Sequence, residues 1–187
     1  MRGVSLYRNI LCLTAMVVAL FMGTALAAPR AMNVDDVVIA GIAPGSDLSY
    51  VRSIYGEPDG EKTIRIGNYN HPAYLVDYYG EGFVITYDIV GGVQNPLIQS
   101  IESTNTALVM PSGIHVGMKI AEVQQIFSNL QEHPSVDKNA AKDYVTPMGD
   151  FGVTLSNGKE GIRFAIFTVD QKGIVQKILL TDKYANV

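Results

Sequence analysis

An internal repeat constrains the fold of this chain more than any other feature of its sequence. Residues 42–56 read IAPGSDLSYVRSIYG and residues 114–128 read IHVGMKIAEVQQIFS, with four identities at a constant offset of 72. More identities follow along both halves, at offsets of 77 and 79. Each change of offset falls in a turn-like segment, where an insertion costs little. The sequence therefore predicts two copies of one unit, over residues 34–107 and 108–184.

Each copy is predicted to begin with a short amphipathic helix. A glycine stands at the entry to both helices, and Ser46 is the predicted N-cap of the first. Gly56-Glu-Pro58 is expected to end the first helix and His133-Pro134 the second, because proline lacks a donor and restricts the residue before it. Apolar residues fall on one stripe of each helix: Leu48, Val51, Ile54 and Tyr55 in the first, and Ile120, Val123, Ile126, Phe127 and Leu130 in the second.

Three strands are predicted to follow each helix. These segments are rich in β-branched and aromatic residues and are separated by glycine-containing turns. They are Tyr74–Tyr79, Phe83–Val90 and Leu97–Thr104 in the first copy, and Phe151–Leu155, Ile162–Val169 and Ile174–Thr181 in the second. The predicted fold class is therefore α+β, with two tandem helix–β–β–β repeats whose helices pack on one face of a continuous antiparallel sheet.

Alternation along the strands separates an apolar face from a mixed face. The apolar face, expected to lie under the helices, includes Tyr74, Val76, Tyr78, Phe83, Ile85 and Tyr87. The mixed face includes Asp77, Tyr79 and Val84, with Arg163 and Phe167 at the matching phase of the second copy. A register error of one residue would exchange the two faces.

The N-terminus has the pattern of a secretory signal peptide. Arg2 and Arg8 precede an uncharged apolar run, Ile10–Met22, and the small-residue stretch Ala25-Leu26-Ala27. This predicts a leader of residues 1–27 that is cut after Ala27. The 13-residue run spans about 20 Å of helix, short of the roughly 30 Å hydrocarbon core. A retained membrane anchor is the alternative, because the run becomes long enough if it is extended to Ala28.

Charge and cysteine content limit what the exported chain does. Residues 1–28 hold two arginines and no acid, so their removal takes the formal net charge from −4 to about −6. A nucleic-acid partner is not expected, because it requires a clustered positive field. The single cysteine, Cys12, lies in the leader, which leaves no thiol for redox or metal chemistry. No later segment is apolar enough to be predicted as a membrane span.

No catalytic or metal-binding pattern is found in the chain. His71, His115 and His133 lie far apart in sequence and have no ligand spacing, and Asp35-Asp36 is interpreted as a solvated pair, with a metal site as the weaker alternative. Asp150-Phe-Gly152 matches a kinase tripeptide without the other kinase motifs. We therefore predict no enzyme activity, no catalytic or metal site and no cofactor.

The helix motif resembles that of a known group of exported domains. Gly41-Ile-Ala-Pro-Gly45, followed by Val51-Arg-Ser-Ile-Tyr-Gly-Glu-Pro58, is similar to the entry helix of β-lactamase-inhibitor-protein-like and BamE (SmpA/OmlA)-like domains. The link Thr104-Asn-Thr to Met118 resembles the join between their tandem copies. The resemblance implies helices on one face of an antiparallel sheet and a second face free to bind protein. It does not carry over the lipid-anchoring cysteine, the cysteine pairs or the inhibitory residues, because the mature chain lacks these cysteines and no inhibitory residue could be mapped onto it.

The sequence therefore favours an exported, non-catalytic protein-binding module in the periplasm or outside the cell. Its expected partner is an envelope protein or a secreted enzyme. The candidate contact residues are Asp77, Tyr79, Val84, Arg163 and Phe167, because tyrosine-rich mixed faces suit recognition. The alternative is a periplasmic carrier of a small ligand or metal in a crevice between the copies. The oligomeric state is left open.

Overall fold

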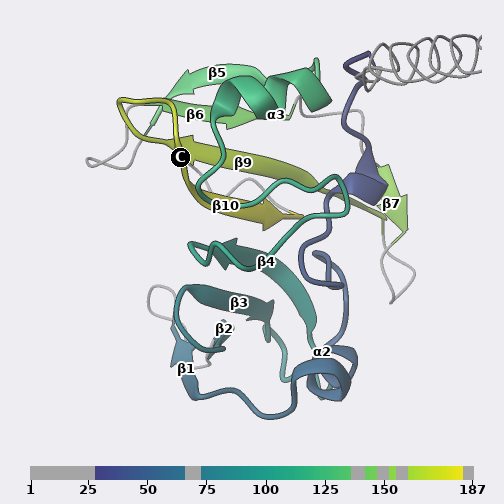
Figure 1. The fold of residues 1–187 in the computed structure, drawn as a ribbon. Helices are drawn as coiled ribbons and strands as arrows, with labels where there is room; N and C mark the ends of the chain where they lie inside the picture. Colours follow the sequence, from purple (N-terminus) through teal and green to yellow (C-terminus); the bar gives the residue numbers. More distant parts are fainter. Residues whose placement is uncertain (1–27, 66–72, 136–141, 147–151, 155–159, 183–187) are drawn as a thin grey trace, which may run out of the picture.

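The computed structural model describes residues 28–65, 73–135, 142–146, 152–154 and 160–182. Its central element is an eight-stranded antiparallel sheet with the strand order β1-β2-β3-β4-β10-β9-β6-β5. Figure 1 shows the first four strands in one half of the molecule and the last four of this order in the other. The two halves join where β4 pairs with β10, so a single continuous sheet crosses the middle of the fold.

The first half contains a short helical turn, one helix and four strands in a meander. These elements are η1 (Val34–Asp36), α2 (Leu48–Tyr55), β1 (Gly60–Ile64), β2 (Tyr74–Tyr78), β3 (Phe83–Asp88) and β4 (Leu97–Ser103). The second half adds a two-stranded hairpin that lies outside the large sheet. Its elements are α3 (Ile120–Ile126), β5 (Gln131–Pro134), β6 (Lys142–Val145), β7 (Gly152–Thr154), β8 (Glu160–Ile162), β9 (Phe164–Val169) and β10 (Val175–Thr181).

The predicted fold class, two helix–β–β–β repeats under a roof of helices, is wrong. Each half contributes four strands to the large sheet, and the described helices, α2 and α3, have only eight and seven residues. The sequence reading missed β1, β5 and β6. The edge strands β1 and β5 are almost wholly exposed and carry no apolar alternation, and β6 has only four residues. The segment predicted as the first strand of the second copy instead forms β7, which pairs only with β8.

Residues that the sequence alignment pairs nevertheless occupy equivalent places in the hydrogen-bond pattern. The Gly45 amide donates to the Ile98 carbonyl at 2.7 Å, and the Gly117 amide donates to the Val175 carbonyl at 2.8 Å. Both glycines have positive φ, +84° and +98°, which a side chain disfavours. The pairing of β3 with β4 shifts by one residue and leaves Gln99 without a partner residue in the register. The pairing of β9 with β10 shifts in the same way at Gln176. The offsets of 72 and 77 thus connect positions with the same backbone role.

The predicted end of the first helix is confirmed, but its predicted N-cap and the predicted end of the second helix are wrong. Asp47, rather than Ser46, caps α2 by accepting a hydrogen bond from the Tyr50 amide at 2.8 Å. Gly56, with φ +74°, ends α2 as expected. The second helix is shorter than predicted, because Phe127 is already extended and His133-Pro134 belongs to β5.

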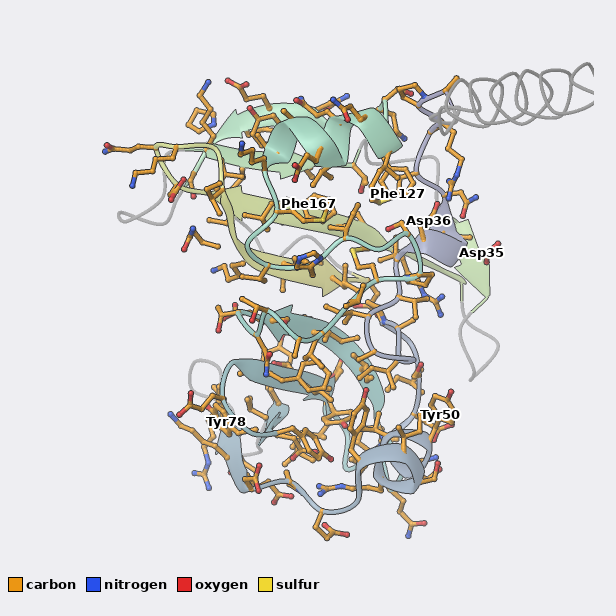
Figure 2. All side chains as sticks on the ribbon, viewed as in Figure 1. Asp35, Asp36, Tyr50, Tyr78, Phe127 and Phe167 are labelled. Atoms are coloured by element: carbon orange, nitrogen blue, oxygen red, sulfur yellow. The ribbon has the colours of Figure 1, made fainter. Side chains whose placement is uncertain are left out.

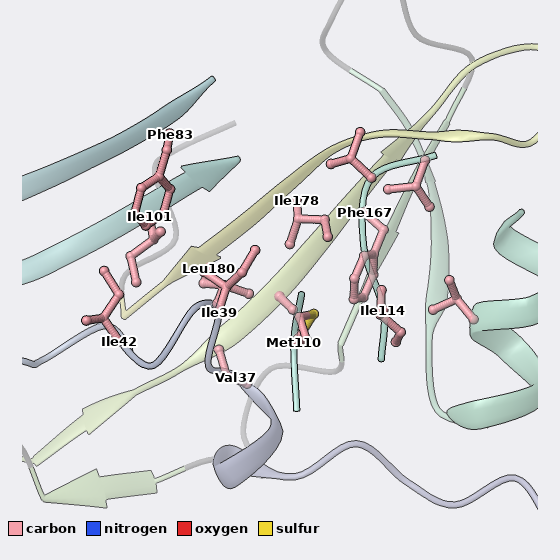
Figure 3. Packing of buried hydrophobic residues seen from close by; sticks show 14 of the residues in the cluster. Val37, Ile39, Ile42, Phe83, Ile101, Met110, Ile114, Phe167, Ile178 and Leu180 are labelled. Carbon is pink, nitrogen blue, oxygen red and sulfur yellow. The ribbon is translucent and has the colours of Figure 1, made fainter. Parts of the chain in front are cut away.

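One face of the sheet is covered mainly by chain without regular structure. Buried residues from the N-terminal segment and from the link between the halves pack on the strands, together with the inner sides of α2 and α3. Figure 3 shows this arrangement: Val37, Ile39 and Ile42 from the N-terminal segment and Met110 and Ile114 from the link lie against Phe83, Ile101, Phe167, Ile178 and Leu180 of the sheet. This extended cover explains how two short helices suffice for a sheet of eight strands.

Candidate functional site

Strand pairing decides which residues share the uncovered face of the sheet. In the first half Tyr78 stands opposite Val84, Val76 opposite Thr86 and Tyr74 opposite Asp88. Directly paired residues lie on the same face, so this set is separated from Phe83, Ile85 and Tyr87, which are buried in the core. The predicted phase of β2 is therefore wrong by one residue relative to β3. Tyr74, Val76 and Tyr78 lie on the uncovered face, not under the helices.

Large apolar side chains on this face reach solvent. Tyr78 and Ile64 are each 38% exposed, and Val84, Ile166 and Leu179 are half-buried. Polar groups lie among them, including Lys177 and Glu102, whose charged atoms are 3.7 Å apart across the β4–β10 join. We call the set Ile64, Tyr78, Val84, Glu102, Ile166, Lys177 and Leu179 the open face. Among the described residues it is the part of the sheet that combines exposed aromatic, aliphatic and charged groups.

The five predicted contact residues do not form one surface. Val84 alone belongs to the open face. Phe167 is 0% exposed in the core, and Asp77 and Tyr79 are buried on the covered face near α2. Arg163 is half-buried at the start of β9, where burial lowers its pKa and Asp182 and Asp35 oppose that shift. The predicted phases of β2 and of β9 thus placed Asp77, Tyr79 and Phe167 on the wrong face.

Asp77 instead belongs to a charged cluster under α2, and Tyr79 lies beside it. The Nη2 atom of Arg52 lies 3.1 Å from Oδ2 of Asp77, and the same guanidinium contacts Glu57 at 2.8 Å and Glu61 at 3.3 Å. The Asp77 side chain is 0% exposed, whereas those of Glu57 and Glu61 are largely in solvent. We call Arg52, Asp77, Glu57 and Glu61 the α2 charge cluster. Arg52 is the member that the sequence reading missed, because it stands next to the apolar stripe and not on it.

Burial dominates the electrostatics of this cluster. Loss of hydration raises the pKa of Asp77 to about 6, although Arg52 acts in the opposite direction and lowers it. Neither carboxylate oxygen of Asp77 has a well-aligned hydrogen bond among the described residues, but the Tyr87 hydroxyl acts on Asp77 as a side-chain hydrogen-bond donor and lowers its pKa. Burial also raises the pKa of Tyr87 and of Tyr79. Asp77 is therefore an acid whose charge is only partly compensated.

Aromatic rings close the cluster on the core side. The ring centroids of Tyr55 and Tyr79 are 5.4 Å apart, and those of Tyr55 and Phe83 are 5.6 Å apart in an edge-on arrangement. The Tyr79 hydroxyl donates to the Gly56 carbonyl at 3.2 Å, and the Tyr55 hydroxyl donates to the Ala40 carbonyl. Tyr55 and Tyr79 thus serve packing, whereas Tyr78 lies on the opposite face of the sheet; Figure 2 shows Tyr78 on β2 at a distance from Tyr50 on α2.

Arg30 forms an ion pair with Asp36 and also ties the N-terminal segment to the end of α3. Arg30 makes two bonds to the Asp36 carboxylate, at 2.7 and 2.5 Å, and its guanidinium lies 4.8 Å from the centroid of the Phe127 ring. The Arg30 amide donates to the Ile126 carbonyl at 3.1 Å. Asp36 is buried, so the prediction of a solvated Asp35-Asp36 pair is wrong for Asp36. Asp36 therefore has a structural role, in which its carboxylate holds the Arg30 side chain in place.

The described residues offer neither a metal cluster nor a membrane-crossing helix. No group of three or more His, Asp or Glu side chains among them is placed to hold an ion. Within the same ranges, every helix is too short or too polar to traverse a bilayer. His71 lies outside the described residues.

Comparison with known proteins gives one distant structural likeness. No protein-family model matches the chain, and no curated protein matches it in sequence. A solved structure, that of a DUF4309 family protein (YjgB) from Bacillus subtilis subsp. subtilis str. 168, is similar with a TM-score of 0.43 and 14% sequence identity, over 77% of this chain and 84% of that one. At this level the likeness assigns neither a family nor an activity. The resemblance to β-lactamase-inhibitor-protein-like and BamE-like domains stays a prediction.

Proposed function

We propose that this chain is an exported, non-catalytic protein-binding module that uses the open face of its sheet. The observation that carries the proposal is the exposure of Tyr78 and Ile64, each 38%, on a face where Val84, Ile166 and Leu179 are also partly accessible. An antiparallel sheet commonly has one packed and one solvated face, but the solvated face is then polar. Here it carries an exposed tyrosine and isoleucine in the first half and the partly accessible Ile166 and Leu179 in the second.

The composition of the open face fits a protein partner. Tyrosine supplies a large contact area with a polar end and is enriched among the residues that dominate binding energies. Glu102 and Lys177 add one charge of each sign, which favours a partner with mixed chemistry over a uniformly charged polymer. The expected partner is an envelope protein or a secreted enzyme, in keeping with the predicted leader of residues 1–27.

A site-specific crosslinking experiment tests this proposal. A photo-reactive phenylalanine analogue at Tyr78 or Val84 is expected to yield a discrete adduct with one protein in the native envelope, and the same analogue at Gln124, exposed on α3, is the matched control. With the captured protein purified, Tyr78→Ala is expected to weaken binding about tenfold or more, as for a tyrosine at the centre of an interface. Adducts of equal yield at Gln124, or unchanged affinity of Tyr78→Ala, would count against the open face.

The alternative function, a carrier that binds between the two halves, gains no supporting observation. The halves meet through direct pairing of Ile178–Thr181 in β10 with Ser100–Ser103 in β4. Strand pairing of this kind brings backbones to about 5 Å, so the join itself provides no crevice for a ligand. We therefore do not propose this function.

A further inference from the structure

The two edges of the eight-stranded sheet differ in their capacity to accept another strand. Strand β1 forms one edge and β5 the other, and among the strands that the structure describes each pairs with a neighbour on one side only. Strand β5 has four residues and ends at Pro134, which has no amide hydrogen to donate. Strand β1 has five residues and no proline, and four of the five are exposed. It is therefore the edge that is open to a further strand.

The charges on β1 are of both signs. Glu61 and Lys62 are neighbours in the strand, Arg65 follows it directly, and all three are exposed. Charged side chains on an edge strand normally discourage pairing, because a second copy brings like charges together. Charges of both signs remove this barrier in any register that sets an acid opposite a base. The alignment of two β1 strands therefore decides whether they attract or repel each other.

Geometry leaves few ways to align β1 with its own copy. Two copies that extend one antiparallel sheet are related by a two-fold axis perpendicular to the sheet, and paired residues lie on the same face. Because side chains alternate between the faces, one residue must then stand opposite its own copy on the axis. An axis at Glu61 sets two carboxylates opposite each other and an axis at Lys62 sets two ammonium groups opposite each other, which is destabilising in both cases. An axis at Gly60 or Ile64 falls at an end of the strand and pairs less of it.

An axis at Thr63 gives a complementary alignment. Thr63 then faces its own copy, and threonine pairs across strands are favourable. Glu61 faces Arg65 of the second copy, and the symmetry supplies this acid–base pair twice. Lys62 faces Ile64 of the second copy on the open face, where the aliphatic stem of the lysine covers part of an isoleucine that is 38% exposed. This alignment therefore combines charge complementarity with burial of an apolar side chain.

We propose that β1 is a self-association edge, through which two copies of this chain form a dimer with its two-fold axis at Thr63. The strand order at the junction is β2-β1-β1-β2, so the open faces of both copies lie on the same side of one continuous sheet. Ile64 and Tyr78 of each copy then stand on the strands nearest to the axis. The dimer goes beyond the proposed function and does not depend on it, because it uses the edge of the sheet and leaves the open face accessible.

Cysteine crosslinking of the full chain tests both the association and its alignment. With Cys12→Ser, an introduced cysteine is the only thiol. Thr63→Cys places two Cα atoms about 5 Å apart across the axis, within the range that a disulfide spans. Lys62→Cys, one residue away and equally exposed, places them about 8 Å apart, beyond that range. Under mild oxidation, Thr63→Cys is expected to give about tenfold more disulfide-linked dimer than Lys62→Cys. Equal yields, or no dimer from Thr63→Cys, would overturn the proposal.

A charge exchange separates the proposed ion pair from other effects of substitution. In the dimer, Arg65→Glu sets two carboxylates opposite each other and Glu61→Lys sets two cations opposite each other. Each variant alone is expected to weaken association about tenfold in sedimentation equilibrium, and an equimolar mixture is expected to form a dimer with one copy of each. A mixture that stays monomeric would contradict the alignment. An unmodified chain with the mass of one copy at every concentration up to about 0.5 mM would contradict the dimer itself.

Discussion

Replacement of Phe167 with alanine is expected to lower the free energy of unfolding by about 3–5 kcal/mol. The Phe167 side chain is 0% exposed and lies on the covered face of β9, among residues of the link and the N-terminal segment (Figure 3). Its truncation removes buried apolar area and leaves a cavity that the extended cover cannot fill without moving. Equilibrium unfolding in urea measures the effect.

The control for this prediction is Val84→Ala on the open face. Val84 is only half-buried, and we expect its truncation to cost about 1 kcal/mol or less. Comparing Phe167→Ala with Val84→Ala also tests the faces of the sheet, because the sequence alone predicted both residues on one contact surface and the structure places only Val84 there. Equal losses of stability, or a Phe167→Ala variant as stable as the unmodified chain, would mean that β9 has the opposite register.

Replacement of Arg52 with glutamine is expected to cost about 3 kcal/mol of unfolding free energy at pH 7.5, because it leaves the Asp77 carboxylate buried without its counter-ion. The loss should shrink as the pH is lowered. Without Arg52 the pKa of Asp77 rises above its value of about 6, so at pH 5 the acid is neutral in the folded protein and no longer needs a partner. Urea unfolding at the two pH values measures this difference.

The double variant provides the control. Arg52→Gln with Asp77→Asn removes both charges, and a buried pair replaced by neutral groups of similar size is often close to neutral in stability. We therefore expect the double variant to recover most of the loss at pH 7.5. A double variant as unstable as Arg52→Gln would show that the loss arises from packing of the arginine side chain or from Glu57 and Glu61.

The central strands and the first helix could be predicted from the sequence because their signals are local. Strand β3 alternates between buried and partly exposed residues, β4 does so on either side of Gln99, and Gly56 ends α2 at a positive φ. The glycines at 45 and 117 and the glutamines at 99 and 176 were paired by sequence, and each pair has the same backbone role. Such positions are recognisable because a turn or a bulge restricts the residue that fits there.

The edge strands and the face of β2 could not be predicted for physical reasons. Strands β1 and β5 bury almost nothing, so no apolar period marks them. Strand β2 has large apolar side chains at alternate positions, Tyr74, Val76 and Tyr78, yet its covered face holds Asp77. Period-two alternation predicts that the apolar set faces the core. In the structure Asp77 faces α2 instead and forms an ion pair with Arg52. The relevant contact spans two elements and leaves no local signal.

The central claim is that the register of β2 places Tyr78 on the open face and its neighbour Tyr79 on the covered face. The solvent accessibility of these two tyrosines tests it. Tyr78 is 38% exposed on the open face, and Tyr79 is 9% exposed on the covered face. Mild tyrosine nitration of the folded protein, read by mass spectrometry of the peptide that contains both, should modify Tyr78 and spare Tyr79 and Tyr87. Modification of Tyr79 with protection of Tyr78 would contradict the register, and with it the proposed binding face.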